Sequence, residues 1–272
     1  MAVAGMLALS SCSNDDNEPI AQNAPQQMTF TAGFGDGATT RASLSGYSVT
    51  FDAPDYISIL SANNTNTKFT STDGGATATF DGTATAGDPT YYAIYPYTGG
   101  LTLNSSTGVI SGVTIPEDQS AAATSPCGWD PAAPIAYATT TNGNLTFHNA
   151  CALLKVTNDV NDVVRIFVTA HSENSPYSHE EPYNGAMSGV YDLNTSNGTL
   201  SRVSITDAES GVEVNGGVLN GKTIYIAIVP GYKAEFSAWC VSSNVRIRSK
   251  TGVTFEAGKI YDLGSTSSWP TL

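Results

Sequence analysis

TFTAGF at residues 29–34 places two phenylalanines and an alanine on one face of an extended chain and two threonines on the other. A period of two is typical of a β-strand with one buried face. Comparable runs recur along the chain, at Tyr47–Val49–Phe51, Ile57–Ile59, 77–81, 90–97, 109–115, 145–157, 163–170, 223–230 and 234–241. Turn-forming Asn-Gly and Asp-Gly pairs lie between several of them. Many short strands without a helical period predict an all-β protein, either a sandwich or a barrel.

The composition agrees with strands and tight turns. Charged residues make up only 13% of the 272 residues, whereas amphipathic helices need Lys, Glu and Arg on their wet face. The net charge of −13 at pH 7 would repel phosphate backbones, so nucleic acid is excluded as a partner. This acidity suits a protein that stays soluble outside the cell.

A break in the pattern at residues 116–143 indicates the domain organisation. This stretch is rich in proline and alanine and does not alternate. We interpret it as a long connection between two β-sandwiches, an N-terminal domain at 28–142 and a C-terminal domain at 143–272.

The N-terminus resembles an export signal. Residues 1–12 form a short apolar run ending in Leu-Ser-Ser-Cys, similar to a bacterial lipobox, and the run is too short for a transmembrane helix. We therefore predict lipidation at Cys12, followed by a flexible acidic tether at 13–27. The tether is either a plain spacer or an acidic signal for transfer to the cell surface. An ordinary buried cysteine at position 12 is the alternative.

Three cysteines remain after Cys12. Cys127 and Cys151 flank the end of the predicted connection and form a possible disulfide in an exported protein, closing a loop of about 25 residues. Cys240 alternates like a core residue. No pair has CxxC spacing, so we expect no metal site.

Catalytic signals are absent from the sequence. There is no GxSxG elbow, His148 alternates within a predicted strand, and His179-Glu180-Glu181 lacks the second histidine of HExxH. The tyrosines of YYAIYPY (91–97) could stack on sugars, but on a strand they more often divide between core and surface. We expect no catalytic residues, no cofactor and no enzymatic activity.

Several segments, in their order along the chain, resemble the fimbrillin family, the subunits of type V pili. The resemblance is carried by TFTAGF, Thr40-Arg41, DAPDYISIL (52–60), YYAIYPY (91–97), IPEDQ (115–119) with PIAYAT (134–139), LTFHNACALLKV (145–156) and FEAGKIYDLG (255–264). It implies two transthyretin-like β-sandwich domains, export as an outer-membrane lipoprotein, and partnership with other pilus subunits by strand exchange. It also implies proteolytic processing between Arg41 and Ala42, which would remove the first strand. In the residue-based alternative, Arg41 only caps a loop.

The end of the chain departs from the pattern of stalk subunits. Only STSSWPTL follows residue 264, which is short for a donor strand, and Pro270 would interrupt a β-ladder. Two functions therefore stay open: a fimbrial subunit, accessory or tip protein acting in adhesion, or a non-polymerising surface lipoprotein that binds glycans or other host or bacterial surface ligands.

Overall fold

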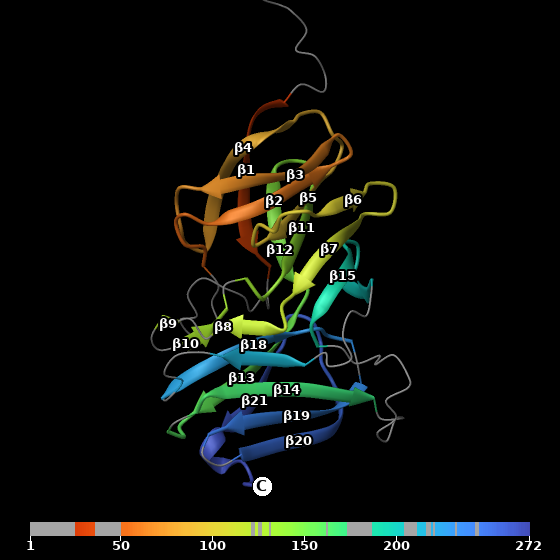
Figure 1. Cartoon of the computed structure of the whole chain (residues 1–272). Helices are drawn as coiled ribbons and strands as arrows, with labels where there is room; N and C mark the ends of the chain where they lie inside the picture. Colours follow the sequence, from red (N-terminus) through yellow and green to blue (C-terminus); the bar gives the residue numbers. More distant parts are fainter. Residues whose placement is uncertain are drawn as a thin grey trace, which may run out of the picture.

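The computed structural model describes residues 25–35, 50–120, 123–124, 127–130, 132–161, 163–172, 187–203, 211–215, 219, 221–231, 233–242 and 245–272. Within these ranges the fold is all-β, as predicted, and the only helical segment is a 3-10 turn at Thr266–Ser268. Figure 1 shows an upper half around β1–β5 and a lower half that contains the C-terminus.

The upper half is a closed barrel of seven strands. Their order is β1 (Pro25–Phe34), β12 (Asn144–Asn149), β11 (Ala136–Thr140), β5 (Tyr91–Tyr95), β2 (Tyr56–Ser61), β3 (Asn64–Ser71) and β4 (Thr77–Thr85). The long antiparallel pairing of β1 with β4 closes the sheet, so an edge that an open sandwich would expose is absent here. This corrects the predicted N-terminal sandwich. Alternating side chains fill the interior with an aromatic-rich cluster.

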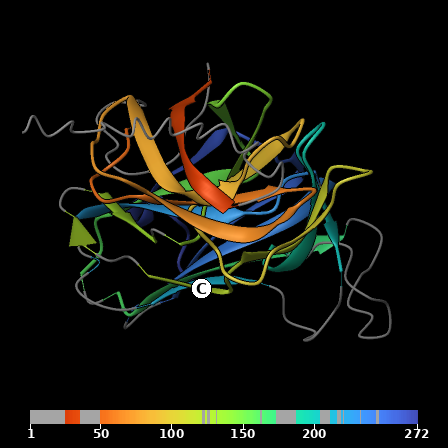
Figure 2. The same cartoon turned by 90° about the horizontal axis from the view of Figure 1, so that it is seen from above.

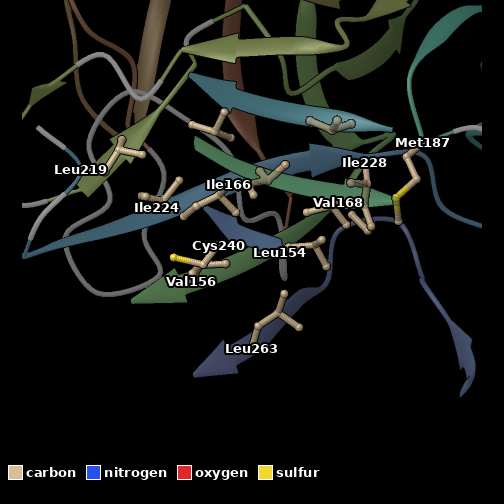
Figure 3. Close-up of a cluster of buried hydrophobic side chains, with 14 of the residues drawn as sticks. Leu154, Val156, Ile166, Val168, Met187, Leu219, Ile224, Ile228, Cys240 and Leu263 are labelled. Carbon is tan, nitrogen blue, oxygen red and sulfur yellow. The ribbon is translucent and has the colours of Figure 1, made fainter. Parts of the chain in front are cut away.

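The lower half contains two five-stranded sheets. One has the order β21 (Ile260–Ser265), β13 (Ala152–Asn158), β18 (Lys222–Ile228), β10 (Cys127–Trp129) and β9 (Ala123–Thr124). The other has the order β20 (Val245–Thr254), β19 (Lys233–Val241), β14 (Arg165–Ser172), β17 (Val212–Asn215) and β8 (Asp118–Ser120). Figure 3 shows the aliphatic core of this half, to which strands of both sheets contribute.

A four-stranded sheet joins the halves, with the order β16 (Thr199–Arg202), β15 (Gly189–Asn194), β7 (Val109–Ile115) and β6 (Thr102–Asn104). Seen from above in Figure 2, the barrel lies over the strands of the lower half. A third apolar cluster combines outward-facing barrel residues such as Ile94 with Ile110 of β7, Tyr191 of β15 and Leu153 of β13.

Strand pairing crosses the predicted boundary between residues 142 and 143. β12 belongs to the barrel although it follows residue 143, and β7 pairs with β15. The predicted strand 145–157 is two strands, which separate at Ala150 and Cys151 and enter different halves. The predicted connection 116–143 contains β8, β9, β10 and β11, so it is not an irregular linker throughout.

Candidate functional site: the seat of the first strand

β1 is held on both sides by backbone hydrogen bonds. It runs antiparallel to β4, from Pro25 opposite Thr85 to Gly33 opposite Thr77. Its other edge pairs in parallel with β12. The N–H of Gly35 extends this contact by donating to the carbonyl oxygen of Phe147 at 3.0 Å. β1 is therefore an interior strand of the barrel, paired with a neighbour on each side.

The inward side chains of β1 occupy three successive positions in the barrel core. Phe30 is 1% exposed, and its ring lies edge-on to those of Phe69 and Tyr91, with centroids 5.3 and 5.4 Å away. Ala32 is fully buried. Phe34 stacks on Phe51 at 5.0 Å, and its ring also lies 5.8 Å from Tyr95 and 5.7 Å from Phe147. We call the place of β1 between β4 and β12 its seat. This seat accepts a large, a small and a large side chain at alternate positions.

Two glycines allow β1 to approach its neighbours closely. A Cβ atom on Gly33 would lie 3.3 Å from Cγ2 of Thr77. On Gly35 it would lie 3.2 Å from both Cε1 of His148 and Cγ2 of Thr146. TFTAGFG thus combines alternation with small residues where the adjacent strands leave little room.

The connection after β1 carries the predicted processing site. The described chain leaves β1 at Gly35 and resumes at Thr50, so residues 36–49 join β1 to Phe51, whose backbone bridges to Gly75. Arg41 and Ala42 fall in this interval, outside the described residues, as do Cys12 and most of the predicted tether.

The predicted disulfide is not present. Cys151 is a free, buried thiol, and burial raises its pKa to about 12. Along β18, Cys127 aligns with Thr223, whereas Cys151 precedes Ala152, which aligns with Ile228. The two cysteines therefore lie about six residues, or about 20 Å, apart along the direction of β18. This is far more than the roughly 7 Å between Cα atoms that a disulfide tolerates. Cys240 is buried in the lower core, as expected.

The tyrosines of residues 91–97 and His148, the other residues singled out in the sequence, occupy ordinary structural positions. Tyr91 and Tyr95 are core residues, while Tyr92 of β5 and Tyr97 after it are only partly buried, so the tyrosines divide between core and surface as predicted. His148 is exposed, with its ring 5.9 Å from that of Tyr137. His179 lies outside the described residues.

Within the described ranges no three His, Cys, Asp or Glu side chains gather as metal ligands. No described helix has the length and apolar character needed to span a membrane.

The C-terminal segment, residues 265–272, docks on the chain's own lower half, which sequence reasoning missed. Trp269 is 1% exposed, and its indole N–H donates to the carbonyl oxygen of Leu263 at 3.1 Å. The guanidinium of Arg246 donates to the carbonyl oxygens of Ser267 and Trp269. The N–H of Ile247 donates to the carbonyl oxygen of Pro270, a contact that uses no N–H of the proline. Pro270 therefore does not prevent the C-terminal residues from pairing with β20. The signal in the sequence was a tryptophan in a polar terminal stretch.

Comparisons with known proteins extend the description of the fold. No family model and no curated protein matches this sequence. Among solved structures, a candidate cell adhesion protein from Bacteroides uniformis superposes with a TM-score of 0.50 at 15% identity, over 90% of this chain and 95% of that one. One of the same description from Bacteroides ovatus gives 0.49 at 14%, over 92% and 96%. A fimbrial protein from Bacteroides ovatus gives 0.36 at 14%, over 87% of this chain and 47% of its own. The first of these likenesses shows a shared fold across nearly the whole chain.

Proposed function

We propose that this protein is a cell-surface adhesion protein of the fimbrial kind, which assembles by exchanging β1 for a strand of another subunit. The observation that carries the proposal is the seat of β1. One strand at the start of the described chain completes both the wall and the core of the barrel, and residues 36–49 join it to the rest. A single cut after Arg41 would sever that connection.

Loss of β1 would leave a groove between β4 and β12. Burial of a phenylalanine contributes about 1.5 to 3 kcal/mol. The apolar surface exposed by the loss of Phe30 and Phe34 therefore strongly favours binding of another strand in the groove. The backbone groups of β4 and β12 would also lose their partners and become two pairing edges. A donor strand that fits should offer a large, a small and a large apolar side chain at alternate positions, matching Phe30, Ala32 and Phe34.

Cleavage of the folded full-length chain with an arginine-specific protease tests the first step. We expect a new N-terminus at Ala42, detected by N-terminal sequencing, because the site is predicted to lie in an accessible connection. The Arg41→Gln variant is the matched control and should stay intact at this position. Resistance of the unaltered chain at Arg41 would contradict the processing step.

Capture of a strand tests the second step. After cleavage, brief exposure to denaturant should release β1, and the remaining chain should bind a labelled peptide with the sequence of residues 25–35. A peptide carrying Ala32→Trp should not bind, because the seat of Ala32 has no room for a large ring. Without added peptide, size-exclusion chromatography should show higher oligomers. A stable monomer that binds neither peptide would favour the non-polymerising surface lipoprotein.

Anchoring to the outer membrane through a lipid on Cys12 is the second part of the proposal, supported by the lipobox-like run and the acidic residues after it. A lipid on Cys12 and processing at Arg41 are compatible, since departure of β1 after the cut would release residues 42–272 from the anchor. Replacing Cys12 with Ala should abolish incorporation of a labelled fatty acid and move the protein out of the membrane fraction. Unchanged labelling would overturn this part.

A further inference from the structure

Asp81 of β4 meets β1 on the outside of the barrel. It lies directly opposite Thr29 in the antiparallel pairing of the two strands. The hydroxyl of Thr29 donates to Oδ1 of Asp81 at 2.6 Å. Because Phe30 points into the core, its neighbour Thr29 faces outward, and Thr29 is exposed. This contact therefore belongs to the outer face of the seat and is separate from the apolar contacts of the inner face.

In the described part of the chain, no ion pair involves Asp81. Its neighbour on β3 is the uncharged Thr70. Lys68 is the only lysine or arginine in the seven barrel strands. Its ammonium nitrogen lies 3.5 Å from the ring centroid of Tyr56 and 5.5 Å from that of Tyr97. The negative charge of Asp81 is thus left to the strand that occupies the seat.

β1 meets this charge with a hydroxyl alone, because residues 25–34 include no charged side chain. The surroundings are acidic: residues 50–149, which contain the other six barrel strands, have eight aspartates and glutamates against one basic residue. A carboxylate opposite Asp81 would place two like charges on paired positions, which destabilises a strand pair, whereas a cation there would be attracted. Asp81 can therefore distinguish strands by a single side chain.

We infer that Asp81 selects the strand that enters the seat of β1. A partner strand is accepted when it carries a hydroxyl or a basic side chain opposite Asp81, and it is rejected when it carries a carboxylate there. This selection rests on the proposed strand exchange and adds a polar requirement to the apolar pattern of the inner face. A basic side chain gives the partner strand an attraction that β1 lacks, so it favours replacement of β1 over its return.

Competition between peptides tests this selection. The full-length chain, cut after Arg41, is briefly denatured and then refolded with an equimolar mixture of two peptides of residues 25–35, one with Thr29→Lys and one with Thr29→Glu. Mass spectrometry of the refolded complex should find about tenfold more of the lysine peptide, because an opposite-charge pair gains and a like-charge pair loses roughly two- to fivefold each. Added salt should reduce this preference, since position 29 is exposed.

Gln27 provides the matched control. It lies on the same face of β1, opposite the uncharged Thr83. Peptides with Gln27→Lys and Gln27→Glu therefore report the general attraction of an acidic barrel, and their ratio should be smaller. In the Asp81→Asn variant of the chain, the preference at position 29 should fall to the ratio found at position 27. An unchanged preference in that variant, or equal preferences at the two positions, would overturn the inference.

Failure of strand exchange and failure of the selection give different results. If not even the unaltered peptide of residues 25–35 is captured, strand exchange fails, and selection by Asp81 fails with it. If peptides are captured without a preference at position 29, strand exchange stands and only the selection is wrong. In the uncut chain, Thr29→Glu should raise the equilibrium constant for unfolding about two- to fivefold more than Gln27→Glu, and Asp81→Asn should remove this difference. Equal effects of the two glutamates would also overturn the inference.

Discussion

At the scale of single residues, Gln119 links the two sheets of the lower half. It belongs to β8, in one sheet, and its side-chain amide reaches the backbone of Ala227 on β18, in the other. Nε2 donates to the carbonyl oxygen of Ala227 at 2.7 Å, and Oε1 accepts from its N–H at 2.9 Å. Gln119 is 2% exposed. Its amide thus takes the place of a neighbouring strand for one residue of β18.

Replacing Gln119 with Leu should lower the free energy of unfolding by about 2 to 4 kcal/mol, because two buried backbone groups of Ala227 would lose their partners. Urea denaturation of both proteins measures this difference. Gln26→Leu, at an exposed glutamine of β1, should change stability by less than about 0.5 kcal/mol. Similar small effects at both positions would show that the backbone of Ala227 finds other partners.

Asp159 holds the docked C-terminal segment. Its carboxylate accepts hydrogen bonds from the hydroxyls of Ser265, Ser267 and Thr266 and from the N–H of Ser267. These donors, the hydroxyls of Ser265 and Ser267 first, hold the pKa of Asp159 well below its usual range. A carboxyl whose pKa is lowered by folding stabilises the native state fully above its unfolded pKa, and the contribution falls as pH drops toward the folded value.

The difference in stability between the unaltered chain and Asp159→Asn should therefore be constant from neutral pH down to about pH 5 and should shrink below about pH 4. Thermal unfolding at a series of pH values measures it. Glu256→Gln, a change at an exposed carboxyl, serves as the control for general charge effects. A difference that grows on acidification would contradict this account.

At the scale of elements, the packing of β3 against β4 depends on a glycine. Phe69 of β3 is fully buried, and its ring lies over Gly82 of β4, where a Cβ atom would be only 2.7 Å from Cγ of the ring. The absence of a side chain in mid-strand lets an aromatic ring lie directly on the backbone.

Gly82→Ala should destabilise the protein by about 1 to 3 kcal/mol, since the added methyl group forces Phe69 from its place. Gly99→Ala is the matched control: nothing lies within 4 Å of its added Cβ atom, so we expect a change of less than about 0.5 kcal/mol. Denaturant unfolding compares the two. An equal cost at both positions would point to backbone conformation as the cause, because only Gly82 faces a crowded site.

At the scale of the whole molecule, the apolar cluster between the halves governs cooperativity. Ile94 of the barrel, Ile110 of β7 and Tyr191 of β15 are all fully buried in it. Domains joined by flexible linkers meet through modest, polar interfaces. Here the contact resembles an interior core, so the halves should unfold together.

Unfolding followed by tryptophan fluorescence and by hydrogen exchange of barrel amides should give one coincident transition. Trp129, Trp239 and Trp269 all belong to the lower half, so fluorescence reports that half alone. Ile110→Ala should lower both transitions equally, by about 2 to 5 kcal/mol. Two separate midpoints would show that the halves unfold independently.

Much of the strand content could be predicted locally. The run 109–115 matches β7, and the predicted strands 77–81, 223–230 and 234–241 lie on β4, β18 and β19. Strands whose residues are mostly polar, such as β3 (NTNTKFTS) and β16 (TLSR), were missed because few of their side chains are apolar. They are strands because neighbouring strands supply the hydrogen-bond partners. Only part of the candidate site could be predicted from the sequence. TFTAGF predicted β1 and its buried face, but not that β4 and β12 would be its neighbours.

The sequence by itself determined the all-β class and the alternation that buries Phe30, Ala32 and Phe34, because both depend on local period and turn residues. Only the tertiary structure decided how the strands associate. It closed the barrel between β1 and β4, divided LTFHNACALLKV between two halves at Ala150, and kept Cys127 and Cys151 apart. The physical reason is that strand pairing is set by contacts between residues far apart in the chain, and an alternating pattern specifies which face is buried but not which neighbour buries it.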